Sequence, residues 1–373
     1  MKLEELIQEL CPDGVETFPL EECCNILDKK RKPVTKNSRE KGEYPYYGAN
    51  GVQDYVSDYI FNGKFVLVGE DGSVITKSGT PVVTWAEGKI WVNNHAHVIE
   101  EKSGTMLRYL YFYIQTIDVT SLIHGNIPKL TGRDFRSLKI ALPPLEIQRE
   151  IVSILDNFTE LTAELTARKT QYTYYRDKLL ANSYKGEIKQ LEECCDSIAD
   201  GDHQAPPKAD SGVPFITISD IDERHEINLN VTKYVPDEYY NRLADKRRPQ
   251  KGDVLYTVVG SYGIPVYISE NKRFVFQRHI AILRPNNAVI DSRYLYHAMN
   301  GTAFHRQADL AAKGAAQKTI GLASLAKMTV PVPPLDVQNR IVNVLDNFEK
   351  ICSDLNIGLP AEIEARQKQY EYY

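Results

Sequence analysis

The sequence lacks the motifs that mark several large classes of enzyme. It contains no Asn/Asp-Pro-Pro-Tyr/Phe motif, which serves adenine methylation, and no GxxxxGK(S/T) loop, which binds nucleotide phosphates. Its six cysteines show neither a CxxC pair nor a His-rich zinc spacing. We therefore expect this chain to bind no cofactor and no metal, and we interpret the cysteines as reduced thiols of a cytoplasmic protein.

Long hydrophobic runs are absent as well. The amino terminus, MKLEELIQEL, is a charged amphipathic helix without the apolar core of a signal peptide, and the longest uncharged run is interrupted by Gly263 and Pro265. The sequence therefore predicts neither export nor a membrane span. Its 373 residues, 42% hydrophobic and 25% charged, suit two globular domains, and a net charge of −5 argues against a general nucleic-acid coat.

The sequence does contain a long internal repeat. The line LPPLEIQREIVSILDNF, residues 142–158, returns as VPPLDVQNRIVNVLDNF at residues 332–348, with ten of seventeen residues identical. Shorter matches precede each line in the same order, among them FPLEECCNI with KQLEECCDSI and NNHAHVI with QRHIAIL. The chain is therefore predicted to be a tandem duplication of a unit of roughly 180 residues.

Each repeated unit has two parts. The first contains short apolar runs such as KFVLVGE and DVLYTVV between Gly, Pro, Asn and Asp, which predicts small mixed strands, with one short helix at MLRYLYFYIQTI and again at SRYLYHAMNGTAF. The second is a long helix that begins after a Pro-Pro pair. The predicted fold class is α+β, with small mixed α/β domains at residues 1–142 and 183–331 and long helices at residues 143–182 and 332–373.

Apolar residues recur along both long helices with alternating spacings of four and three, the pattern of a coiled-coil seam. If the helices bury these seams against each other in antiparallel orientation, a pseudo-two-fold axis relates the two domains and a spacer of fixed length separates them. The seam residues are Ile147, Ile151, Ile154, Phe158 and Leu161 in the first helix, and Val337, Ile341, Val344 and Phe348 in the second.

Two similar modules at a fixed separation are suited to reading two half-sites on DNA. Residues 28–41 hold seven Lys or Arg against two acids, and residues 242–251 hold five against one, both in segments predicted to be loops. Amide and basic side chains able to contact base edges lie near by. The predicted DNA-binding residues are Lys29, Lys30, Arg31, Lys32, Tyr47, Asn50, Asn93, Asn94, His95 and Lys129 in the first domain, and His203, Gln204, Arg247, Arg248, Ser261, Tyr262, Gln277, Arg278, Lys313, Gln317 and Lys318 in the second.

The repeated lines, followed by ARKTQYTYYRDKLL and by ARQKQYEYY, resemble the specificity subunit of type I restriction-modification enzymes over the whole chain. The resemblance implies a non-catalytic subunit in which each target-recognition domain reads one half of a split, asymmetric site on double-stranded DNA. It also implies two methyltransferase subunits docked on the helices and two restriction subunits. S-adenosylmethionine, ATP and Mg²⁺ are then expected on these partners, and no membrane is involved.

The two long helices differ in a way that the resemblance makes informative. The first carries a Thr-Ala-Glu-Leu unit, Thr162, Ala163, Glu164 and Leu165, which resembles the family branch in which this repeat sets the spacer. The second has the unrelated EKICSDLNIGLPAEIEAR. The family usually continues past QYEYY with a short ending like RDKLL, whereas this sequence stops at Tyr373, and we expect weaker docking of one methyltransferase subunit.

Two other interpretations stay open at this stage. A duplicated scaffold would hold peptides or glycans at a fixed separation, and salt-dependent binding to duplex DNA would distinguish it from a DNA reader. A hydrolase would use His95 with Glu87, or His203 with Asp202, although no triad is evident. His95 and His97 would need a third ligand to hold a metal, so a turn or a base contact is the favoured role of this segment.

Overall fold

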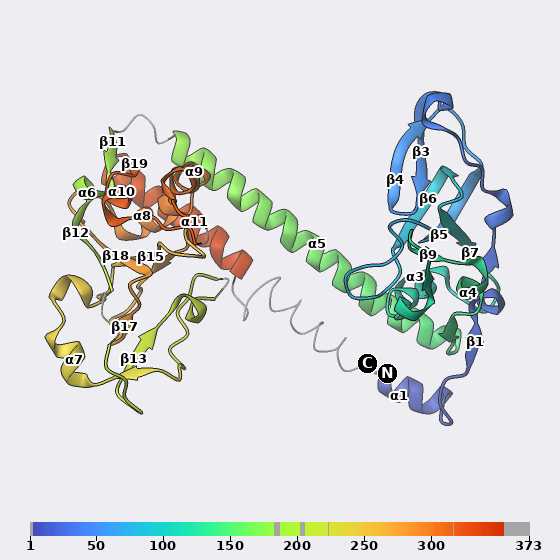
Figure 1. Cartoon of the computed structure of the whole chain (residues 1–373), viewed down its shortest axis with the longest axis horizontal. Helices are drawn as coiled ribbons and strands as arrows, with labels where there is room; N and C mark the ends of the chain where they lie inside the picture. Colours follow the sequence, from blue (N-terminus) through green and yellow to red (C-terminus); the bar gives the residue numbers. More distant parts are fainter. Residues whose placement is uncertain (1–2, 183–186, 202–205, 223, 316, 354–373) are drawn as a thin grey trace. The chain divides into compact units, whose positions relative to one another are not determined.

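A computed structural model describes residues 3–182, 187–201, 206–222, 224–315 and 317–353. By its internal contacts the chain divides into two compact units, and the division falls between Leu161 and Thr162. Unit 1 denotes the described residues up to Leu161, and unit 2 those from Thr162 onward (Figure 1). Among the helices that the structure describes, none is long and apolar enough to cross a membrane.

Unit 1 is built on a six-stranded sheet in the order β2-β7-β5-β6-β3-β4. The centre of the sheet is β5, which pairs antiparallel with β6 and β7 and is buried from Phe65 to its end. The strands are β1 (Thr17–Pro19), β2 (Asn25–Ile26), β3 (Lys41–Gly48), β4 (Gly51–Val56), β5 (Phe61–Gly69), β6 (Val83–Val92), β7 (Ala96–Glu100), β8 (Ile123–His124), β9 (Lys129–Leu130) and β10 (Lys139–Ala141). The helices are α1 (Leu3–Leu10), α2 (Leu20–Cys23), α3 (Leu107–Ile114), α4 (Gly132–Arg136) and the start of α5 (Leu145–Asn182), with 3-10 turns η1 (Asp28–Lys30), η2 (Lys36–Ser38) and η3 (Thr120–Leu122).

Unit 2 has a four-stranded sheet in the order β12-β18-β15-β16 and a three-stranded sheet in the order β14-β13-β17. Its strands are β11 (Glu187–Gln190), β12 (Cys195–Asp200), β13 (Val213–Ile216), β14 (Tyr234–Val235), β15 (Val254–Thr257), β16 (Pro265–Tyr267), β17 (Val275–Phe276), β18 (Ile280–Pro285) and β19 (Thr329–Val332). Its helices are α6 (Leu191–Cys194), α7 (Asp237–Arg242), α8 (Ser292–Met299), α9 (Thr302–Ala311), α10 (Leu322–Ala326) and α11 (Leu335–Ser353), with turns η5 (Ile218–Asp220) and η6 (Asp245–Arg247).

The two units share a pattern of strands and helices. β15 pairs antiparallel with β18 in unit 2, as β5 pairs with β7 in unit 1. The short helices predicted at residues 106–117 and 292–304 correspond to α3 and to α8 with the start of α9, and α3 and α8 each add buried aromatic and leucine side chains to their unit's core. The two-stranded ladders β1-β10 and β11-β19 also correspond.

The glutamine of the repeated line is buried in both copies, which gives a physical reason for its repetition. Gln148 donates from Nε2 to Pro143 O at 2.8 Å and accepts from Met106 N at 2.8 Å. Gln338 repeats both bonds, with Pro333 O at 2.7 Å and Asp291 N at 2.7 Å. Each glutamine therefore fastens the first turn of a long helix to the start of the short helix α3 or α8 in its own unit. The aspartates of the two lines, Asp156 and Asp346, likewise pair with Arg108 and Arg293.

The first turns of α5 contact the amino-terminal helix α1. Ile147 and Ile154 are buried, but they pack with Ile151 against Leu3 and other apolar residues of α1. The amphipathic helix α1 thus covers this part of the seam, a contact that the seam pattern did not predict, and a contact of these three residues with the second long helix stays a prediction. Phe158 and Leu161, farther along α5, are half-buried.

The last turns of α5 belong to unit 2. Leu180 is buried in the same core cluster as Ile341, Val337 is half-buried against it, and Tyr175 stacks on Phe348 with ring centroids 5.9 Å apart. Val344 is 42% exposed. Pairing of the two long helices along their whole length stays a prediction, since residues 354–373 lie outside the described part of the chain.

Between these two anchored ends lies the Thr-Ala-Glu-Leu unit. Thr162, Ala163 and Glu164 are exposed and Leu165 is half-buried. Glu164 pairs with Arg168 one turn later, at 3.5 Å. This ion pair joins residues four positions apart on α5 and is therefore internal to the helix.

Candidate nucleic-acid interface

Three loops meet at one end of the unit 1 sheet. They are residues 70–73 after β5, residues 93–95 between β6 and β7, and residues 125–128 between β8 and β9. Main-chain hydrogen bonds tie them together: Glu70 N to His95 O at 2.8 Å, Leu130 N to Glu70 O at 2.9 Å, and Gly72 N to Pro128 O at 2.9 Å. We call this the three-loop surface. Because the bonds use only backbone atoms, they fix the loops and leave the side chains free to differ.

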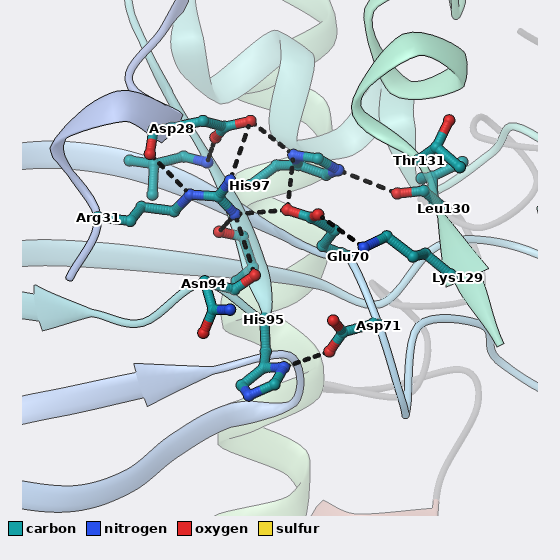
Figure 2. Close-up of polar contacts among 12 residues, drawn as sticks. Asp28, Arg31, Glu70, Asp71, Asn94, His95, His97, Lys129, Leu130 and Thr131 are labelled. Atoms are coloured by element: carbon teal, nitrogen blue, oxygen red, sulfur yellow. Dashed lines mark hydrogen bonds and ion pairs between the residues drawn. The ribbon is translucent and has the colours of Figure 1, made fainter. Parts of the chain in front are cut away.

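His97 lies beneath the three-loop surface at the centre of a polar network (Figure 2). Its Nδ1 is 2.7 Å from Asp28 Oδ2, and its Nε2 is 3.1 Å from Leu130 O. Its ring stacks on Phe135 with centroids 4.1 Å apart, and Asp28 Oδ1 accepts from Val98 N at 2.9 Å. Both ring nitrogens face oxygen atoms, an arrangement that a doubly protonated imidazole satisfies. One buried side chain therefore joins η1, β7 and the end of the third loop.

Arg31 and Glu70 complete this network. Arg31 Nη1 is 2.6 Å from Glu70 Oε2 and 2.8 Å from Ala96 O, and Lys129 Nζ is 3.3 Å from Glu70 Oε1. The Arg31 side chain is only 12% exposed and also lies 3.6 Å from Asp28. These inward contacts give Arg31 a structural role, because its charge balances two partly buried carboxylates, and its contact with phosphate stays a prediction.

The network keeps Asp28 ionised. Burial alone would raise the pKa of the Asp28 carboxyl, but the hydrogen bond and charge of His97, the Val98 N–H and the charge of Arg31 outweigh it and hold this pKa below its usual range. A carboxyl with a lowered folded-state pKa stabilises the fold above the unfolded value of about 3.9, and that contribution disappears as pH falls through the folded value.

We therefore expect unit 1 to lose stability as pH falls below about 4, and Asp28→Asn to flatten that loss while lowering stability at neutral pH. Urea unfolding of both proteins over a series of pH values measures the effect. Parallel pH profiles for the two proteins would show that Asp28 is not a source of the acid sensitivity.

A cavity of about 530 Å³ opens at the three-loop surface. His95 Nδ1 contacts Asp71 Oδ1 at its rim, and the His95 side chain is 48% exposed. Asn93 is buried below the rim, where its Oδ1 accepts from His95 N at 2.8 Å and its Nδ2 donates to Gln53 Oε1 at 3.3 Å. Polar residues that line the cavity are Asn50, Gln53, Asp71, Ser73, His95 and Lys129.

The structure thus brings together several of the predicted base readers of unit 1 and separates others. Asn50, His95 and Lys129 line one cavity, whereas Asn93 supports the loop from below. Asn94 is exposed beside His95, and Tyr47 is half-buried on β3, where its carbonyl accepts from Asn93 N. Lys29, Lys30 and Lys32 are exposed, and Lys32 N donates to Val92 O at 3.2 Å, directly before the second of the three loops.

Unit 2 carries the same three loops with the same three main-chain bonds. Val258 N donates to His279 O at 2.8 Å, Ile320 N to Val258 O at 2.8 Å, and Gly260 N to Lys318 O at 2.9 Å. The correspondence equates residues 258–261, 277–279 and 313–319 of unit 2 with the three loops of unit 1. This backbone arrangement is therefore a property of the repeated unit, independent of the side chains that it displays.

The predicted DNA-binding residues of unit 2 gather on these loops more completely than those of unit 1. Five of them are exposed there: Ser261, Arg278, Lys313, Gln317 and Lys318. Gln277 is half-buried, and Tyr262 donates its hydroxyl to Asp309 at 2.9 Å. His203 and Gln204 lie outside the described residues.

Arg247 and Arg248 stand apart from this set. Both are half-buried, Arg247 near Asp200 at 3.7 Å and Arg248 near Asp245 at 3.5 Å. Asp245 also pairs with Arg284 at 2.7 Å. The fold thus brings Asp200 from outside residues 242–251 next to Arg247, whereas Asp245 belongs to that segment and is shared by Arg248 and Arg284.

The interiors beneath the two three-loop surfaces differ. Strand pairing places Ala281 of unit 2 where unit 1 has His97, and Tyr256 where unit 1 has Val68. Val258 takes the position of Glu70. The tyrosine ring packs edge-on against Phe304 in an apolar core. Within the described part of the chain the charged network therefore occurs in unit 1, and the described residues of unit 2 support the same loops by hydrophobic packing.

Two acidic clusters with a histidine occur among the described residues, one of Asp28, Glu70 and His97 and one of His297, Asp346 and Glu349. In each, an arginine bonds to the carboxylates, Arg31 in the first and Arg293 in the second. These clusters are charge-compensated by the protein itself. His95 contacts Asp71 and His97 contacts Asp28, so the two histidines do not converge on one metal position. Glu87, the acid considered with His95 for a hydrolase, pairs with Lys64 at 3.6 Å.

Sequence reasoning missed the acids of the site. Asp28, Glu70 and Asp71 determine how Arg31 and His95 point, yet none is among the predicted residues. A usable signal does exist, because Glu70 and Asp71 directly follow the apolar run FVLVG, where strand ends commonly carry functional side chains. Asp28 opens the basic stretch, where it counts only toward the charge balance.

Comparisons with known proteins agree with one another. Residues 12–172 and 186–365 each match the family model described as the type I restriction modification DNA specificity domain. The chain is 34% identical to a putative type I restriction enzyme specificity subunit of Haemophilus influenzae. The alignment covers all of this chain and 96% of that protein. It is 33% identical, over 73% of its length and 70% of the relative, to the EcoR124I/EcoR124II specificity subunit of Escherichia coli.

The fold has a solved counterpart. The crystal structure of a type I restriction-modification S subunit from M. genitalium matches with a TM-score of 0.67 at 13% identity, covering 96% of this chain and 94% of that one. The two family matches coincide with the duplication seen in the sequence and in the paired three-loop surfaces. On these grounds the chain belongs to the family of type I restriction-modification DNA specificity subunits.

Proposed function

We propose that this chain gives a type I restriction-modification enzyme its DNA sequence specificity, with each unit reading one half of a bipartite, asymmetric target through its three-loop surface. The observation that carries the proposal is the repetition of the three main-chain bonds in both units with different side chains on them. A constant scaffold with variable side chains suits two modules that read different sequences in the same way.

The chemistry of the displayed side chains fits base-edge recognition. Unit 1 presents Asn50, Gln53 and His95 around one cavity, and unit 2 presents Arg278 and Gln317 on exposed loops. Amides match the donor and acceptor pair of adenine, and guanidinium groups match the two acceptors of guanine. Because unit 1 and unit 2 display different side chains, their two DNA half-sites would differ in sequence and the whole target would be asymmetric.

The proposal includes partners. We expect the chain to assemble with methyltransferase and restriction subunits, two of each, and to bind double-stranded DNA as part of that assembly. S-adenosylmethionine, ATP and Mg²⁺ are assigned to those partners, since they would perform the methylation and the ATP-driven cleavage. The long helices are the elements that set the spacer and dock the methyltransferases.

Mapping methylated adenines in cells that express the chain with its methyltransferase subunit tests the function directly. The expected pattern is one motif with two specific halves and a nonspecific gap. Deletion of this chain alone should remove methylation at every site of that motif. Methylation that persists without the chain would refute the proposed role.

Exposed lysines beside the unit 1 surface are expected to supply phosphate contacts. Replacing Lys29, Lys30 and Lys32 by Ala should weaken binding to all duplexes alike, and the slope of log K against log salt should fall by about 0.9 for every phosphate that is no longer neutralised. Lys64→Ala, nearer the start of β5 and paired with Glu87, is the control and should leave the slope unchanged. A triple variant with the wild-type slope would mean that these lysines are only solvated.

A further inference from the structure

We propose that His95 is a specificity-determining residue of unit 1 and that Asp71 positions it, so that Nε2 donates a hydrogen bond to an acceptor edge of one base, best matched by guanine. The proposal rests on the proposed function and deepens it, because it names a contact by which one unit reads its half-site. It follows from four features of the three-loop surface.

The first feature is a backbone that is fixed on both sides of the His95 side chain. His95 N donates to Asn93 Oδ1 at 2.8 Å, and His95 O accepts from Glu70 N at 2.8 Å. Asn93 is itself buried and bonded to Gln53. The loop therefore holds the His95 backbone rigidly. Such rigidity is needed by a side chain that must meet the edge of a DNA base within a few tenths of an ångström.

The second feature is the orientation of the ring. Its Nδ1 contacts Asp71 Oδ1, so the aspartate both limits the ring's rotation and takes the hydrogen on Nδ1 (Figure 2). The other nitrogen, Nε2, has no hydrogen-bond partner among the residues that the structure describes. The ring is half-exposed on the cavity that Asn50, Gln53 and Lys129 also line. Nε2 is thus the polar atom that His95 has left for a ligand.

The third feature is chemical. The contact with Asp71 becomes an ion pair when the ring is protonated, and Nε2 then carries a hydrogen that it can donate. In the major groove, guanine offers two adjacent acceptors, N7 and O6. With both nitrogens protonated, a histidine held in this way favours guanine over cytosine, which offers a donor.

The fourth feature is the equivalent residue of unit 2. His279 occupies the position of His95, since its carbonyl accepts from Val258 N as that of His95 accepts from Glu70 N. The residue that follows is Val259 in unit 2 and Asp71 in unit 1. Burial lowers the pKa of His279, and the charge of Arg278 lowers it further. The two units thus place a histidine at the same point beside different neighbours, Asp71 in unit 1 and Val259 with Arg278 in unit 2.

The test uses the full chain assembled with its methyltransferase subunit, and duplexes carrying the target identified by methylation mapping. Each base pair of both half-sites is replaced in turn, and the affinity ratio of matched to replaced duplex is measured. We expect His95→Ala and Asp71→Asn each to reduce this ratio about tenfold at a single guanine position of the first half-site. The ratios in the second half-site should keep their wild-type values.

Three further variants separate the proposal from trivial effects. Asp71→Glu keeps a carboxylate and should retain most of the discrimination, which a purely structural role for Asp71 would not predict. Asp58→Asn removes the same charge at the opposite end of β5 and should change nothing. His279→Ala should move the loss to the second half-site.

Two results would overturn the inference. One is wild-type discrimination at every position of the first half-site in His95→Ala. The other is an equal loss in both half-sites, which would indicate damaged folding or general affinity. If the unmodified assembly shows no sequence preference at all, the proposed function itself fails, and that outcome is distinct from both.

Discussion

A second Thr-Ala-Glu-Leu inserted after Leu165 is expected to lengthen the nonspecific gap between the two half-sites by one base pair and to leave both half-sites unchanged. Four residues add about 6 Å to a helix and turn it through about 400°, which leaves the seam about 40° from its original register. An added length of about 6 Å is on the order of one to two base pairs at 3.4 Å each.

The inserted residues would lie in a stretch of α5 away from the described cores of both units. Ile147 and Ile154 anchor the start of α5 in unit 1, and Leu180 anchors its end in unit 2. Thr162, Ala163 and Glu164 lie between these anchors and are exposed. The insertion therefore alters none of the described core contacts of either unit, and both three-loop surfaces should keep their own sequence preference.

A two-residue insertion at the same place is the matched control, and its effect should be far larger. It rotates one end of α5 by about 200° relative to the other, so the anchored faces can no longer both point correctly, and methylation should be abolished. Methylation mapping in cells reads out both variants. A changed half-site in the four-residue variant, or a gap of unchanged length, would rule out the role of α5 as a ruler.

The second large effect is expected for His97→Ala, which should destabilise unit 1 by about 3–5 kcal/mol. The substitution leaves Asp28 partly buried without its main partner, removes the bond to Leu130 O, and opens a cavity against Phe135. The loss should appear in urea unfolding and as faster amide hydrogen exchange at Val98, whose N–H donates to Asp28.

The neighbouring histidine supplies a matched control. His95→Ala removes an imidazole only two residues away, but one that is half-exposed, and its effect on stability should stay within about 0.5 kcal/mol. His97→Ala should therefore lower the stability of unit 1, whereas His95→Ala should change base recognition and leave stability nearly unchanged. If His97→Ala unfolds at the same urea concentration as the unmodified chain, the buried network contributes little to unit 1.

The sequence is most informative where local rules and the repeat agree. The Pro-Pro pairs and the following heptad pattern predict a long helix at residues 143–182, which in the structure begins at Leu145, and apolar runs such as KFVLVGE predict strands, here β5. The sequence matches between the two repeats also predict structure correctly, because residues such as Gln148 and its counterpart Gln338 make the same local contacts in each copy. Local contacts of this kind depend on nearby residues, and a short stretch of sequence records them.

Sequence is least informative where partners are far apart along the chain. His97 meets Asp28 across 69 residues and Leu130 across 33, and no periodicity connects them. The same limit applies to Arg31, because its pairing with Glu70 joins residues 39 positions apart. It also explains Ile147, since the seam shows that this residue is buried but does not show that α1 covers it.

The paired glutamines have a consequence for how such proteins can change. Gln148 and Gln338 make equivalent bonds, each to the backbone just before it and to the first residues of a short helix in its own unit. Ten of the seventeen residues around them are identical. A genetic crossover within the two encoding segments would therefore join one recognition unit to the other's helix with this joint intact. Whole recognition units can therefore be exchanged between chains. A new DNA target would then arise in one recombination event, without intermediate sequences that fail to fold.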